Sequence, residues 1–110
     1  MYSEVPELVK RLKPNKAYEE LSPKMKVGLQ ILEYSDIDHK DVYFSKLVGD
    51  MKNVSRQTIH QSLDSLIDQG TISSKWDKNE KQRWVRGYKP ASEGQKRLLR
   101  RTYYATHDEE

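Results

Sequence analysis

Apolar residues recur at helical spacing near the start of the chain. Four of them stand at positions i, i+3, i+4 and i+7, namely Val5, Leu8, Val9 and Leu12. This pattern predicts a first helix over residues 4–13, and Pro14 ends it because proline lacks the N–H that the next helical hydrogen bond needs. Residues 15–21 leave room for one further short turn.

A second helix is predicted to begin at Pro23. Ser22 is a residue type that caps helices through its hydroxyl, and proline is favoured at the first helical position. The helix carries two apolar stripes, of which one consists of Met25, Leu29 and Leu32 and the other of Val27, Ile31 and Tyr34. We therefore expect it to be packed on two sides. The polar residues 35–41 then form a loop.

Two shorter helices follow, joined by a tight turn. Apolar residues at helical spacing over 43–51 predict the first, which ends near Lys52 and Asn53 because asparagine tolerates left-handed backbone. The second is predicted over 55–69, with Ser55 as its cap and Gly70 just beyond its end. Its core stripe consists of Ile59, Leu63, Leu66 and Ile67.

The remainder of the sequence predicts a β-hairpin and a last helix. "TISSKWD" (71–77) and "QRWVRGY" (82–88) favour strands, and the polar "KNEK" between them favours a turn. Ser92 then caps a helix whose apolar stripe consists of Leu98, Leu99, Thr102 and Tyr103. The predicted fold class is mainly α with a small β-hairpin wing (α+β), in the element order of a winged helix-turn-helix.

The 110 residues contain no repeat or interdomain linker, so we expect one domain over 1–110. It divides into an N-terminal helical extension (1–21), a winged-helix core (22–90), a C-terminal helix (91–106) and an acidic tail (107–110). The absence of cysteine excludes disulfides, thiolate metal sites and cysteine nucleophiles. Neither a signal peptide nor an apolar membrane span is visible, which predicts a cytoplasmic protein without membrane contact.

Charge is distributed unevenly although the net charge is only +3. Residues 75–101 contain ten lysines and arginines against three acids, whereas residues 33–68 contain seven acids and four bases. Such asymmetry indicates an anionic partner on one side of the molecule. In a winged helix-turn-helix the second helix of the pair enters the DNA major groove and the hairpin reaches the backbone or minor groove.

The helix over 55–69 suits this role because its outer face is uncharged near the N-terminus. Gln57, Thr58 and Gln61 are expected at base edges, where glutamine pairs with adenine and threonine contacts the thymine methyl group. The residues expected at the backbone or minor groove are Ser55, Arg56 and His60 on the helix and Lys78, Lys81 and Arg83 on the basic wing (75–86). Asp64 and Asp68 would be repelled by phosphate, so the helix should enter the groove with its N-terminal end.

Residues 44–99 resemble winged-helix transcription regulators of the MarR and PadR types. "FSKLVGDM" is similar to their first motif helix, "VSRQTIHQSLDSLIDQGTI" to their recognition helix, and "KNEKQRWVRGYKPASEGQKRLL" to their wing and the segment after it. The resemblance implies a DNA-binding homodimer formed through the N- and C-terminal helices. It places Arg83 at the position of a wing arginine and Gln57, Thr58 and Gln61 at base-facing positions.

Other features of the sequence allow more than one interpretation. Trp76 and Trp84 can stack on bases, but anchoring the hairpin on the body is the more usual role of such large aromatics. "DIDHKD" (36–41) lacks the glycine and distant glutamate of a calcium loop, so no metal or cofactor is expected. No catalytic motif is present, which argues against an enzyme. The predicted function is a sequence-specific, double-stranded-DNA-binding transcriptional regulator. The rivals are a winged-helix protein-interaction module in a larger complex and a replication or chromatin protein that binds nucleic acid without sequence choice.

Overall fold

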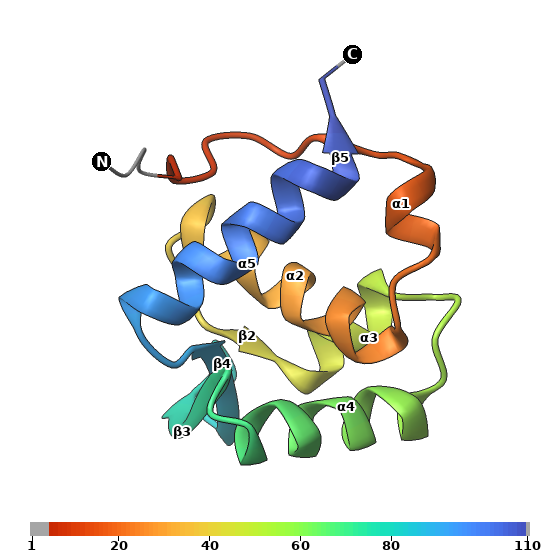
Figure 1. Ribbon diagram of the computed structural model, residues 1–110. Helices are drawn as coiled ribbons and strands as arrows, with labels where there is room; N and C mark the ends of the chain where they lie inside the picture. The colour runs from red at the N-terminus through yellow and green to blue at the C-terminus, as the bar shows by residue number, and fades with distance from the viewer. Residues whose placement is uncertain (1–4, 110) are drawn as a thin grey trace.

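A computed structural model describes residues 5–109 (Figure 1). Helices are the main secondary-structure elements of the described residues, and one long hairpin follows the fourth of them. In chain order the elements are β1 (Lys13–Pro14), α1 (Lys16–Glu19), α2 (Pro23–Asp36), β2 (Val42–Tyr43), α3 (Phe44–Asp50), α4 (Arg56–Asp68), β3 (Ile72–Lys78), β4 (Trp84–Pro90), α5 (Glu93–Thr106) and β5 (His107–Asp108). The predicted helix pair and hairpin are confirmed, with boundaries shifted by about a residue at most ends.

The strands form two small antiparallel sheets. In the larger one β4 lies between β2 and β3, so that Val42 opposes Tyr88 and Ile72 opposes Pro90. The smaller sheet pairs β1 with β5 and joins the two ends of the described chain. Gly87 allows β2 to lie close to β4, because a Cβ added there would stand 3.1 Å from the Cβ of Asp41.

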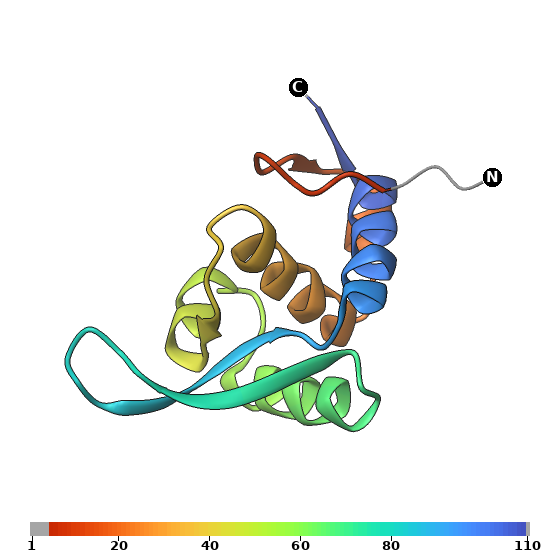
Figure 2. The same cartoon turned by 90° about the vertical axis from the view of Figure 1, so that its left-hand side faces the viewer.

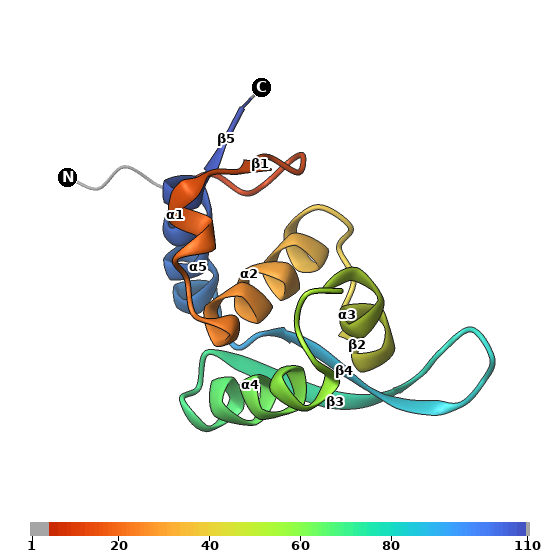
Figure 3. The same cartoon turned by 90° about the vertical axis from the view of Figure 1, so that its right-hand side faces the viewer.

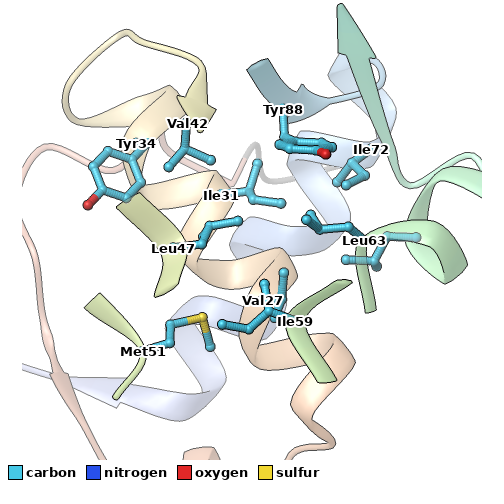
Figure 4. Close-up of a cluster of buried hydrophobic side chains, with 11 residues drawn as sticks. Val27, Ile31, Tyr34, Val42, Leu47, Met51, Ile59, Leu63, Ile72 and Tyr88 are labelled. Atoms are coloured by element: carbon cyan, nitrogen blue, oxygen red, sulfur yellow. The ribbon is translucent and has the colours of Figure 1, made fainter. Parts of the chain in front are cut away.

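Helix α2 packs on two sides, as its two stripes predicted. Ser22 caps it by accepting the N–H of Met25 at 3.2 Å. One stripe faces a core formed with β2, α3, α4, β3 and β4, and this core contains Val27, Ile31, Tyr34, Val42, Leu47, Met51, Ile59, Leu63, Leu66, Ile72 and Tyr88 (Figure 4). The other stripe contributes Leu29 and Leu32 to a second cluster with Leu8, Leu99 and Tyr103. The N-terminal segment and α5 therefore complete a core that the winged helix alone would leave open.

The helix predicted over 4–13 is wrong for the described residues 5–13. This segment contains no helix; Leu8 is buried and Val9 is 85% exposed. The Leu8 N–H donates to Asp36 Oδ2 of α2 at 3.2 Å, and the Leu12 N–H donates to the Tyr103 hydroxyl of α5 at 3.0 Å. Partners distant in sequence thus satisfy backbone groups that a helix would have used itself. Within the described part of 1–21, helix is confined to α1.

The C-terminal region differs from its prediction in two details. Leu98 is 55% exposed, and Thr106 joins Leu99 and Tyr103 on the buried side of α5. The predicted acidic tail begins with a strand in which His107 is buried and stacks on Tyr103, with 3.8 Å between ring centroids. Burial lowers the pKa of His107 below that of a free histidine. Glu110 lies outside the described residues.

Candidate nucleic-acid interface

The N-terminus of α4 is fixed by a serine cap. Ser55 Oγ accepts the N–H of Thr58 at 3.1 Å, and the Ser55 hydroxyl donates to Thr58 Oγ1 at 2.8 Å. The backbone carbonyl of Thr58 in turn accepts the buried Ser62 hydroxyl at 2.7 Å. Thr58 is therefore half-buried with its hydroxyl already engaged, so its methyl group is the part best suited to an outside contact.

Gln57 and Gln61 lie on the outward face of α4. Both side chains are exposed, and neither makes a hydrogen bond with another described residue. They stand one helical turn apart on the side opposite to the buried Ile59 and Leu63. Asp64 continues the same face toward the C-terminal end and is exposed as well. The outward face is thus uncharged in its first half and acidic in its second.

Phe44, the first residue of α3, organises the flank of α4. The Arg56 guanidinium carbon lies 5.5 Å from the centroid of the Phe44 ring, and the His60 ring lies 4.9 Å from it at an angle of 44°. Both side chains remain exposed. Phe44 therefore holds a cation beside the N-terminus of α4. Phe44 belongs to the apolar pattern over 43–51, which does not by itself indicate a contact with α4. The i, i+4 spacing of Arg56 and His60 places both on the flank that faces α3.

The wing tip, residues 79–83, is built around Asn79. Its Oδ1 accepts the N–H of Lys81 at 2.9 Å and that of Arg83 at 3.0 Å. Its backbone carbonyl accepts the N–H of Gln82, which has a left-handed φ of 61°. Because the Asn79 N–H donates to the Arg83 carbonyl, residues 80–82 form the loop itself, a common three-residue hairpin loop with one left-handed residue. It presents the Lys81 and Arg83 side chains to solvent.

The two tryptophans of the hairpin do not anchor it, so the anchoring prediction is wrong. Trp76 is 65% exposed and Trp84 64% exposed. The strands are long enough to project past the helical body, as Figures 2 and 3 show. Ile72 and Tyr88, near the base of the hairpin, supply the buried contacts instead. Lys78 lies over the Trp84 ring, with its Nζ 5.3 Å from the centroid.

Helix α4 and the hairpin occupy one edge of the molecule, and the described chain ends occupy the opposite edge (Figures 1 to 3). The predicted residues therefore form two groups on one side. Gln57, Gln61, Arg56 and His60 belong to α4, whereas Lys78, Lys81 and Arg83 belong to the hairpin. An ion pair between Lys75 Nζ and Asp41 Oδ2, 3.6 Å apart, links the hairpin to the loop before β2.

The acidic residues of "DIDHKD" each have a separate cationic partner. Asp36 binds Arg100, Asp38 binds Arg11, and Asp41 lies beside Lys75. Within residues 5–109 no cluster of three or more potential metal-binding side chains occurs. None of the helices in that range is long and apolar enough to cross a lipid bilayer.

Comparison with known proteins agrees with this architecture. No protein-family model matches the sequence, and no curated protein matches it either. Among solved structures the chain is similar to Pex from Synechococcus sp. (strain PCC 7942), with a TM-score of 0.55 and 23% sequence identity over 77% of this chain and 81% of that chain. The chain thus has a PadR-like winged-helix fold, which confirms the predicted α+β class and the family likeness at the level of fold.

Proposed function

We propose that the protein is a sequence-specific transcriptional regulator that binds double-stranded DNA. The observation that carries this proposal is the uncharged outward face on the N-terminal half of α4, which lies at the same edge as a cationic hairpin. A major groove admits an α-helix, and glutamine is one of the few side chains that pair bidentately with adenine. Gln57 and Gln61 read base edges in this arrangement, and the Thr58 methyl group meets a thymine methyl.

Backbone contacts come from both groups of cations. At the start of α4, the exposed N–H groups, Ser55 and the Arg56 side chain suit a phosphate, and His60 lies one turn further along. On the hairpin, Lys78, Lys81 and Arg83 bind the adjacent backbone or minor groove. Asp68, at the C-terminal end of α4, stays outside the groove. The helix therefore enters the groove with its N-terminus first.

The proposed role is DNA binding without a catalysed reaction. The protein acts in the cytoplasm, needs no metal or cofactor, and forms a homodimer. A two-fold dimer places two α4 helices about one DNA turn apart, which implies a palindromic site. Because residues 5–13 form no helix, the dimer interface is assigned mainly to α5.

Selection of bound DNA from a random duplex pool tests the role of α4. Gln61→Ala should change the preferred base at one position, with a loss of about 1–3 kcal/mol for the original site. Arg83→Ala should weaken all sequences alike and reduce the salt slope by about one. Lys16→Ala in α1 serves as a control for the loss of a positive charge, since α1 lies away from α4 and the hairpin (Figure 1).

Three other results would contradict the proposal. Absence of duplex binding at low salt would favour the protein-interaction module. Steep salt dependence without any sequence preference would favour binding by phosphate contacts alone. Identical behaviour of the Gln61 and Arg83 variants would show that the two residues do not have the separate roles assigned to them.

A further inference from the structure

One face of the hairpin combines aromatic rings with cations. Trp76 opposes Arg86 across the strands, and Lys78 opposes Trp84, so these four side chains lie on one face. On this face each aromatic residue has a cation as its neighbour along its own strand and another cation opposite it on the paired strand. We name this exposed surface, formed by Trp76, Lys78, Trp84 and Arg86, the aromatic–cationic face.

The aromatic–cationic face has no function in stabilising the body. Both tryptophans are about two-thirds exposed, and neither indole N–H donates a hydrogen bond within residues 5–109. Large aromatics usually supply buried area, and a tryptophan exposed to this extent on a projecting hairpin gains little of that stabilisation. Two such residues side by side are therefore unexplained by folding.

Charge on this face is of one sign. Its register positions carry no carboxylate, because Asp77 lies on the opposite face, where its Oδ1 accepts the N–H of Lys78 at 2.8 Å. Lys78 lies over the Trp84 ring, and Arg86 turns toward the base of the hairpin, where it donates to Ser74 Oγ and lies 5.9 Å from the Tyr88 centroid. A partner must therefore be anionic and offer flat, apolar surfaces.

We propose that the aromatic–cationic face binds unpaired bases of single-stranded DNA. A single strand offers both phosphates for the cations and free base faces on which tryptophan can stack. Base pairs in an intact duplex cover one another's faces, so a duplex would offer the tryptophans much less. An acidic protein surface would satisfy the cations but would leave the two indole rings without planar partners.

This inference rests on the proposed function only in taking DNA as the partner. Gln57 and Gln61 belong to α4 and are not part of the aromatic–cationic face. A protein that holds one unpaired strand beside a duplex site would favour DNA that is locally opened. The two activities can therefore fail separately.

Intrinsic fluorescence reports directly on this face, because Trp76 and Trp84 are the only tryptophans of the chain. Titration with a single-stranded oligothymidine should quench the emission, whereas a fully paired, blunt-ended duplex without loops or overhangs should quench it much less. Trp76→Ala and Trp84→Ala should each weaken single-strand binding by about 5- to 150-fold, the range that loss of one stacked base gives. Both sites are exposed, so these variants should unfold at the midpoint of the natural protein.

Lys89→Ala is the matched control, since it removes a cation from the opposite face of the same strand. It should weaken binding by no more than a few-fold. The proposal is overturned if the single strand leaves the emission unchanged, if the fully paired blunt-ended duplex quenches equally, or if the tryptophan variants bind like Lys89→Ala. Emission that depends only on protein concentration would instead show hairpins of two copies packing together. If the tryptophan variants keep the sequence preference for duplex DNA, single-strand binding by the aromatic–cationic face is independent of base recognition by α4.

Discussion

Two aspartates near the end of α2 hold arginines at the same distance but in different surroundings. Asp36 Oδ2 lies 2.7 Å from Arg100 Nε, and Asp38 Oδ2 lies 2.7 Å from Arg11 Nη2. The Asp36 side chain is completely buried and also accepts the Leu8 N–H, whereas that of Asp38 is 33% exposed. Burial therefore distinguishes the two pairs, because water screens the second and not the first.

Replacement of each aspartate by asparagine should reveal this difference. Asp36→Asn leaves the Arg100 charge poorly compensated in a half-buried position, and breaking a buried pair typically costs about 3–5 kcal/mol. Asp38→Asn should cost about 1 kcal/mol or less, as exposed pairs do. Urea unfolding of the three proteins measures both changes. Equal losses would contradict the assignment of Asp36 as a buried structural residue.

For single residues, the sequence shows where the polar side chains stand but not which distant residues they bind. Asp36 stands among loop acids in the sequence, and its partner Arg100 is 64 positions away. Glu33 is a similar case: it accepts the Tyr103 hydroxyl across 70 positions, and burial raises its pKa. Nothing in a local pattern marks such pairs. Ser22, Ser55 and Ser92 were predictable as caps because a cap acts within three residues.

Among the elements, the wing tip depends on two residues with opposite expected effects. Asn79→Ala removes the acceptor for the N–H groups of Lys81 and Arg83, which should loosen the tip by about 1 kcal/mol. Gln82→Gly relieves a left-handed conformation and should tighten it by a similar amount. Amide hydrogen exchange at Lys81 and Arg83 measures both. Faster exchange in the glycine variant would show that the left-handed turn does not limit the tip.

Local pattern predicted the elements where local contacts form them. The periodicity of α2, the cap of α4 and the polar turn of the hairpin all act over a few residues. The N-terminal segment has the same periodicity but forms no helix over residues 5–13, because Asp36 and Tyr103 accept two of its backbone N–H groups. The exposure of Trp76 and Trp84 could not be predicted from the sequence either, because it depends on how far the strands project past the body.

On the scale of the whole molecule, the candidate nucleic-acid interface and the described chain ends lie at opposite edges. Helix α4 and the hairpin lie at one edge, and the β1–β5 pair with the C-terminal end of α5 lies at the other (Figures 1 to 3). The order of elements in the sequence predicted this fold. The uneven charge favours an anionic partner on the side of the hairpin, and this stays a prediction. The assignment of single residues to bases or phosphates stays a prediction, because it depends on the pose of DNA.

The proposed homodimer uses the outer face of α5, where apolar and small side chains remain exposed. Leu98 is 55% exposed, and Ala105, two turns further along, is exposed as well. Sedimentation at micromolar concentration should therefore give a dimer, and Leu98→Asp should give a monomer because it places two carboxylates across the two-fold axis.

The monomer should bind a palindromic site about 10-fold or more weakly than the natural protein, since it loses the second linked contact. Val9→Asp, on the N-terminal segment, tests whether that segment contributes to the dimer interface. A natural protein that sediments as a monomer would refute the dimer and remove the expectation of a palindromic site.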